Sequence, residues 1–191
     1  DKVDRAMQYI KANWRKADDT YTLALVANAL VSWDKNDADA SAALEKLHDM
    51  KVTEDKTTHW KGSATVTFTH GDAADVEATA LTLMAFMKAG KYADTTTEGL
   101  TWIIQKKEAS GHWGSTQSTI LALKVLTLSL QHQTKDVNAN IRVLVNDTVV
   151  SEFKVTNEDA DVMRLVDAGE QTRVGGNKVR IEFSGEGSLL Y

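Results

Sequence analysis

The 191-residue sequence contains no cysteine and no proline. Without cysteine, the chain by itself can form no disulfide, thiolate metal site, cysteine nucleophile or thioester. Without proline, long helices are not interrupted, and tight turns depend on glycine instead. Both absences favour a protein of long helices with no thiol chemistry of its own.

Long hydrophobic runs and an excess of positive charge are also missing. No apolar stretch reaches the roughly 18 uncharged residues that a membrane span requires. The 22 basic residues are outnumbered by 27 acidic ones, whereas nucleic acid attracts clustered cations. We therefore expect no membrane span and no nucleic-acid partner. Because the chain starts at Asp1 inside a helical pattern, without Met or a signal-like segment, we expect a piece of a longer protein.

Hydrophobic periodicity predicts three pairs of helices. Each pair joins an amphipathic helix to one that is apolar nearly all round and should be surrounded by protein. The amphipathic helices are expected at 2–16, 36–50 and 95–107, and the apolar ones at 23–31, 75–89 and about 115–130. This alternation fits two concentric helical layers. The predicted fold class is mainly α with a β tail: a partial α/α toroid of three helical hairpins, followed by a small antiparallel β unit.

The apolar helices begin alike, with a polar residue, a spacer and a threonine, at Thr20-Tyr21-Thr22, Glu77-Ala78-Thr79 and Gln117-Ser118-Thr119. Their unequal separations indicate a structural repeat with loops of different length. Residues 53–72 are polar and irregular, and Val66-Thr67-Phe68 within them is either a short strand or an extended loop.

Past His132 the pattern changes to short alternating segments that predict four or five strands. Strands are expected at 141–145, 150–155, 162–166 and 179–183, and Asn146-Asp147 marks a hairpin turn between the first two. The boundary near 133–137 divides the chain into domains 1–135 and 136–191.

The run Trp113-Gly114-Ser115-Thr116-Gln117-Ser118-Thr119 resembles the Gly-Ser-Thr-Gln signature near the end of the thioester-containing domain of the alpha-2-macroglobulin and complement family. Ser118 stands where that pattern has Asp or another residue. Three other segments are similar to the family in the same order: 21–25, an inner helix start; His59-Trp60, a short aromatic segment; and 75–81, with Val-Glu-Ala-Thr. The β tail resembles the second half of the family's CUB-like unit.

The resemblance implies that the thioester tetrapeptide Cys-Gly-Glu-Gln and an activating histidine lie upstream of this chain. The parent would trap proteases or tag targets covalently, and this piece would give scaffold and contact surface without enzymatic activity or cofactor. Its implied partners are proteases or target surfaces through the intact parent, the parent's remaining domains, and a second copy. We expect an exported parent, extracellular, periplasmic or in the cell envelope; the lack of cysteine suggests a bacterial or archaeal member.

Other candidate sites have simpler explanations. Ala168-Gly169-Glu170-Gln171 is similar to the thioester tetrapeptide, but a turn between strands accounts for it. Glu77, Thr79, Gln117 and Thr119 form a polar ring that would line a concave site or, as we favour, cap helices and bond within the inner layer. Trp113 is expected to fill the core between helix ends.

No metal site is expected. The five histidines have no i, i+4 pairing. The acidic run Asp34, Asn36, Asp37 and Asp39 lacks the glycine of a calcium loop and fits a helix cap better. Asn146-Asp147-Thr148 is a glycosylation sequon, which matters only in a eukaryotic secretory pathway.

Two other functions remain open. The first is an enzyme on the same architecture, of terpene cyclase, prenyltransferase or glycosidase type. A cyclase requires a clustered aspartate motif, and Asp37-Ala38-Asp39 is the nearest to one. The zinc site of a prenyltransferase requires a cysteine, which this chain lacks. A glycosidase needs two carboxylates that face each other across a cleft. The second is a pure interaction module, because half a toroid leaves inner helices uncovered and would associate with itself or with residues outside the chain.

Overall fold

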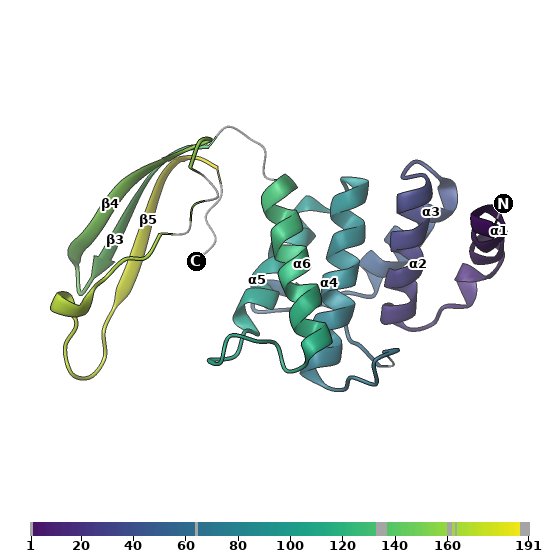
Figure 1. The fold of residues 1–191 in the computed structure, drawn as a ribbon, viewed down its shortest axis with the longest axis horizontal. Coiled ribbons are helices and arrows are strands. Elements are labelled where there is room, and N and C mark those ends of the chain that lie inside the picture. The colour runs from purple at the N-terminus through teal and green to yellow at the C-terminus, as the bar shows by residue number, and fades with distance from the viewer. Residues whose placement is uncertain (1, 64, 133–136, 160–161, 163, 188–191) are drawn as a thin grey trace. The chain divides into compact units, whose positions relative to one another are not determined.

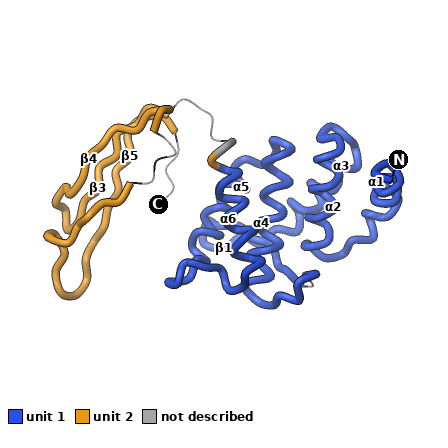
Figure 2. Tube along the Cα trace, viewed as in Figure 1, with its two compact units in different colours: residues 1–129 blue, residues 130–191 orange. Residues whose placement is uncertain are grey.

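A computed structural model describes residues 2–63, 65–132, 137–159, 162 and 164–187. The chain divides into two compact units, Asp1–Ser129 and Leu130–Tyr191 (Figure 2). The first is helical and the second is a small β unit, so the predicted fold class of mainly α with a β tail is confirmed.

The helices follow the predicted order (Figure 1). They are α1 (Lys2–Asn13), α2 (Thr20–Trp33), α3 (Ala38–Asp49), α4 (Asp72–Ala89), α5 (Ala93–Gln105) and α6 (Thr116–His132), with a 3-10 turn, η1 (Trp14–Lys16), after α1. Local signals set their ends. Asp19 accepts a 2.8 Å bond from the amide of Thr22 at the start of α2, and Gly90 takes a left-handed conformation (φ 68°) to end α4.

Helix α4 lies at the centre of the helical unit. Every residue from Ala74 to Phe86 is buried, and α4 packs against α2 on one side and α5 on the other. The prediction of a helix surrounded by protein is therefore correct for α4. It is wrong for the other two apolar helices, which keep large side chains about half exposed: Leu25 and Trp33 on α2, and Ile120, Leu123 and Leu130 on α6.

A β-hairpin that the sequence did not predict follows α3. Strands β1 (Val52–Glu54) and β2 (Thr57–His59) pair antiparallel, and β2 packs against α5. Asp55 and Lys56 make the turn with positive φ angles of 46° and 65°, which is the geometry of a tight hairpin. The Val66-Thr67-Phe68 segment forms a turn, with the amide of Phe68 donating to the carbonyl of Thr65 at 3.1 Å.

The β unit is a three-stranded antiparallel sheet in the order β4-β3-β5. The strands are β3 (Asn138–Val145), β4 (Thr148–Thr156) and β5 (Val179–Glu186). The predicted turn at Asn146-Asp147 joins β3 to β4, with φ angles of 51° and 66°. Ile141 of β3 is buried and lies opposite Phe153 and Phe183.

The strand predicted at 162–166 is wrong for the residues that the structure describes. Residues 162 and 164–166 do not form a strand, and Met163 lies outside the described residues. The alternation of apolar side chains suggested a strand, but Leu165 is 98% exposed. The segment therefore has no core against which an alternating strand would pack.

Within the described ranges, no helix is both long and apolar enough to cross a membrane.

Candidate functional site

The signature stretch forms the turn between α5 and α6. Gly111 and Gly114 adopt φ angles of 90° and 79°, which side chains other than glycine rarely tolerate. Between them Trp113 turns into the core, where it is only 4% exposed. Its indole N–H donates to the carbonyl of Ile103 at 2.7 Å, and its backbone N–H donates to Thr119 Oγ1 at 3.0 Å. The structure thus places Trp113 in the core, between the end of α5 and the start of α6.

Two serines close the first turn of α6. The amide of Ser118 donates to Ser115 Oγ at 3.0 Å, and the amide of Ser115 donates to Ser118 Oγ at 3.0 Å. These reciprocal bonds form a capping box in which a serine replaces the usual glutamate. The hydroxyl of the buried Ser118 also donates to the carbonyl of Trp113. The polar residues of the signature therefore fix the turn that presents the tryptophan to the core.

The same arrangement occurs one helical hairpin earlier. The indole N–H of Trp60, which is fully buried, donates to the carbonyl of Leu47 at 2.7 Å, and its backbone N–H donates to Thr79 Oγ1 at 3.0 Å. Leu47 is the third residue from the end of α3, as Ile103 is the third from the end of α5. Thr79 and Thr119 thus accept the same hydrogen bond, from a tryptophan amide, in successive helical hairpins.

The first repeat differs. Thr22 occupies the corresponding position on α2 but is exposed. The hydroxyl of Thr20, two residues earlier, donates instead to the carbonyl of Lys61. The threonines predicted as three equivalent helix starts therefore share one role in two of the three cases.

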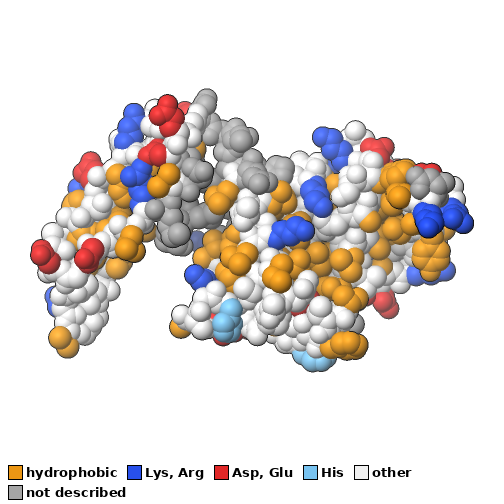
Figure 3. Space-filling model, viewed as in Figure 1, with side chains coloured by type: hydrophobic (Ala, Val, Ile, Leu, Met, Phe, Trp, Pro, Cys, Tyr) orange, Lys and Arg blue, Asp and Glu red, His pale blue; other side chains and the backbone are white. Residues whose placement is uncertain are grey.

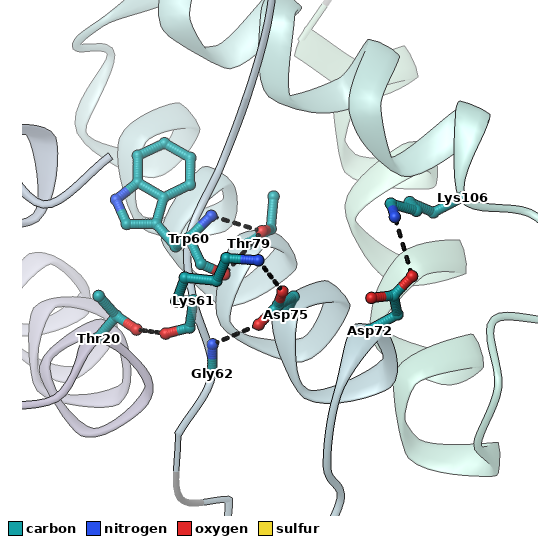
Figure 4. Close-up of polar contacts among 8 residues, drawn as sticks. All are labelled: Thr20, Trp60, Lys61, Gly62, Asp72, Asp75, Thr79 and Lys106. Atoms are coloured by element: carbon teal, nitrogen blue, oxygen red, sulfur yellow. Dashed lines mark hydrogen bonds and ion pairs between the residues drawn. The ribbon is translucent and has the colours of Figure 1, made fainter. Parts of the chain in front are cut away.

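The segment after Trp60 docks on the start of α4 (Figure 4). The amide of Gly62 and the ammonium of Lys61 donate to the two carboxylate oxygens of Asp75, at 2.8 and 2.9 Å. A side chain at position 62 would meet the carbonyl oxygen of Ala74 at 2.2 Å, so only glycine allows this approach. Sequence reasoning missed Asp75 as an anchor, because the glycine that it holds is thirteen residues away.

Glu77 contacts the loop that follows the 60–62 segment. It is fully buried on α4, and its carboxylate accepts from Thr67 Oγ1 at 3.1 Å. Burial raises the pKa of Tyr21, and the charge of Glu77 raises it further. The Thr67 hydroxyl is also within hydrogen-bond distance of Thr65 Oγ1 and Thr69 Oγ1, at 3.0 and 2.9 Å, so neighbouring threonines hold the residue that binds the carboxylate.

The predicted polar ring is not brought together into one site. Thr79 and Thr119 each bind a tryptophan amide, Glu77 accepts from Thr67, and Gln117 is half-buried at the start of α6. Among the described residues, no hydrogen bond joins Glu77 to Gln117. The four residues occupy equivalent positions on two helices, α4 and α6. Three of the four form hydrogen bonds within the fold.

The acidic candidates also form internal contacts. Asp37 caps α3 by accepting from the amide of Asp39 at 2.8 Å, and it pairs with Lys11, whose bond holds the pKa of Asp37 below its usual value. Asp39 accepts from the indole of Trp14 and from Arg15, both at 2.9 Å. No group of three or more metal-binding side chains occurs in the described part of the chain.

The thioester-like tetrapeptide lies in the β unit. Gly169–Gln171 form one turn of 3-10 helix, η2, between β4 and β5. The amide of Gly169 donates to Asp167 Oδ1 at 2.9 Å, and the carbonyl of Gln171 accepts from the side chain of Asn146. The tetrapeptide therefore serves as a turn that closes against the β3–β4 hairpin.

The same tryptophan contact links α3 to α4 and α5 to α6, and these successive helical hairpins define a helical repeat domain. The family model for the A-macroglobulin TED domain matches residues 1–128, and the chain belongs to this family.

Complement proteins are among its relatives. The chain is 30% identical to complement C3 of Eptatretus burgeri over 85% of its length, and 28% identical to complement C3 of Lethenteron camtschaticum over 98%. Thioester-containing protein 1, allele R1, of Anopheles gambiae is 25% identical over 97% of the chain. The chain covers only 10%, 11% and 13% of these three proteins. All three come from animals, so the comparisons do not support the expected bacterial or archaeal origin.

Proposed function

We propose that this chain is a non-catalytic scaffold and contact part of a complement-like protein. The parent would tag target surfaces or trap proteases through a thioester carried by residues outside this chain. One observation carries the proposal: residues 1–128 match the TED family, yet the chain has no cysteine with which to form a thioester. The bonds of Thr79 and Thr119 to tryptophan amides support a structural role for the polar ring.

The related complement and thioester-containing proteins favour an extracellular parent, and nothing in the comparisons favours the periplasm. We assign residues 1–135 to the TED-like part and residues 136–191 to a CUB-like half. The three-stranded sheet of the β unit supports this second assignment.

Methylamine, which opens thioesters by attacking their carbonyl carbon, tests the absence of this chemistry. The isolated chain, incubated with methylamine and analysed by intact mass spectrometry, should gain no adduct and release no thiol. It should also capture no protease covalently. A methylamine-sensitive covalent complex with a protease would overturn the proposal. A fragment that spans Cys-Gly-Glu-Gln of a related complement protein is the positive control.

A contact surface is supported by the exposed apolar side chains of α2 and α6. Leu25, Ile120 and Leu123 are 40%, 52% and 53% exposed. Figure 3 shows hydrophobic side chains with interspersed Lys and Arg over the region of α2, α4 and α6. A surface of this kind usually meets a partner, here the remaining domains of the parent or a second copy.

Light scattering over a range of concentrations measures association of the isolated chain. We expect the mass to rise with concentration, and Leu123→Glu to reduce the rise. Thr97→Glu, at an exposed position on α5, is the matched control. A strictly monomeric chain at high concentration would count against this surface.

A further inference from the structure

Both ends of α5 are held by histidines that stack on aromatic rings. His48, on α3, stacks on Tyr92 with ring centroids 4.3 Å apart and planes 11° from parallel. His59, the last residue of β2, stacks on Trp102 at 4.7 Å and 5°. Tyr92 immediately precedes α5 and Trp102 lies in its last turn. The helix is therefore attached to two neighbouring elements through imidazole rings.

His59 is buried without a hydrogen-bond partner. It is 2% exposed, and neither ring nitrogen has a partner among the described residues. A neutral imidazole already carries one N–H donor, so burial leaves that donor unsatisfied at some cost. A second proton would add a charge at the same place, beside Lys106, whose ammonium is 5.3 Å from the centroid of the Trp102 ring. Protonation is therefore costly while β2 and α5 are packed together.

The charged groups around His59 act in both directions. Burial is the largest cause that lowers the pKa of His59, and the positive charges of Lys61 and Lys106 lower it further. Asp75 and Glu54 raise it, but the net direction is downward. Asp72 also lies near this ring and pairs with Lys106 at 2.9 Å. The hydrogen bond from Lys106 lowers the pKa of Asp72, and the charge of His59 is among the smaller causes that lower it further.

Opposing effects also set the pKa of His48, at the other end of α5. Burial lowers the pKa of His48, as does the charge of Lys51, while Asp49 opposes them. His48 Nε2 lies 3.3 Å from Thr95 Oγ1, in the first turn of α5. The neutral ring can accept from this hydroxyl, and protonation would remove that acceptor.

We propose that the two histidine stacks form an acid-sensitive attachment, from which α5 opens locally as the pH falls. The proposal does not rest on the proposed function. The open state binds protons that the packed state disfavours, so acid shifts the equilibrium towards opening. The attachment is fully stable above the ordinary histidine pKa of 6.5 and weakens as the pH falls below that value.

Amide hydrogen exchange measured by mass spectrometry tests the opening. Protection of α5 is compared at about pH 7.5 and about pH 5.5, the range in which histidine acquires charge, after correction for intrinsic exchange. We expect protection of 93–105 to fall roughly tenfold at the lower pH, while buried α4 keeps its protection. The double variant His48→Phe/His59→Phe keeps aromatic rings at both stacks without titrating groups, and its α5 protection should not change. Equal wild-type protection at both pH values, or the same fall in the variant, would overturn the proposal.

A titration of the wild-type chain needs no variant to fold. Proton–carbon NMR follows the imidazole resonances of His48 and His59, with the urea-unfolded chain as reference. Both should titrate at lower pH than the same residues in the unfolded chain. If either titrates at or above its unfolded value, the proposed attachment is wrong.

Discussion

The indole nitrogen of Trp113 lies 2.7 Å from the carbonyl oxygen of Ile103, and Trp60 repeats this contact with Leu47 at the same distance. Carbonyls in the last turn of a helix lack an α-helical partner. Leu47 and Ile103 each accept from a backbone amide, that of Met50 at 3.1 Å and that of Lys106 at 3.2 Å. Each indole N–H therefore adds a second donor to a helix-end carbonyl while the tryptophan fills the core. Threonines 79 and 119 hold the tryptophan amides, although they lie 19 and 6 residues further along the chain.

Replacing either tryptophan by phenylalanine should destabilise the helical unit. Trp113→Phe and Trp60→Phe each remove one of the two donors to a helix-end carbonyl, which costs about 0.5–1.5 kcal/mol, and the smaller ring leaves core volume unfilled, which adds to the loss. The free energy of unfolding in urea, followed by the helical circular dichroism signal, measures the loss. Trp33→Phe is the matched control, because Trp33 is 48% exposed and its change should stay within about 0.5 kcal/mol. Equal effects at the three positions would refute the repeated contact.

Gly62→Ala should be tolerated poorly. The added methyl group would lie 2.2 Å from the carbonyl oxygen of Ala74. The 60–62 segment would have to move away from Asp75, at an expected cost of about 1–3 kcal/mol. Gly176→Ala is the control, since a side chain there meets nothing within 4 Å. Thermal unfolding of both variants gives the comparison, and a stability of Gly62→Ala equal to wild type would show that the segment is not closely docked.

The capping box makes a smaller contribution. Ser115→Ala removes the oxygen that accepts from the amide of Ser118, and loss of such a cap costs about 1 kcal/mol. Thr116→Ala, at the exposed next position, should change stability by less than about 0.5 kcal/mol. Denaturant unfolding measures both values. Because alanine is a better helix former than serine or threonine, an equal loss in both variants, or no loss at Ser115→Ala, would contradict the capping role of Ser115.

The ion pair between Lys106 and Asp72 should make the free energy of unfolding depend weakly on pH. The hydrogen bond from Lys106 lowers the pKa of Asp72 below the ordinary 3.8. The pair therefore stabilises the folded chain above that pH, and the stabilisation is lost as the pH falls through the lowered pKa. Because Asp72 is 77% exposed, Asp72→Asn should cost at most about 0.5 kcal/mol at neutral pH. Urea unfolding at neutral and acid pH tests this, and a large loss at neutral pH would contradict it.

Hydrophobic periodicity was enough to predict the six helices, but not the contacts between them. The similar starts at Thr79 and Thr119 were visible, whereas the tryptophans that they bind stand at unequal separations. The β1–β2 hairpin was missed because its strands have three residues each and its Asp55-Lys56 turn contains no glycine.

The candidate site was only partly predictable for a related reason. Helix position identified Glu77 as polar within an apolar helix, but its cover by Thr67 depends on an irregular loop. Likewise, five scattered histidines gave no pattern in the sequence. The pairing of His48 and His59 with aromatic rings at the two ends of α5 arises only from folding.

The central proposal is that this TED-family chain comes from a complement-like parent whose thioester lies outside residues 1–191. The most direct test incubates the full-length parent with labelled methylamine and maps the label by tandem mass spectrometry. The account predicts a label on a glutamine outside residues 1–191, and none on Gln117 or on Gln171 of the thioester-like tetrapeptide. A label on any glutamine of this chain would contradict it.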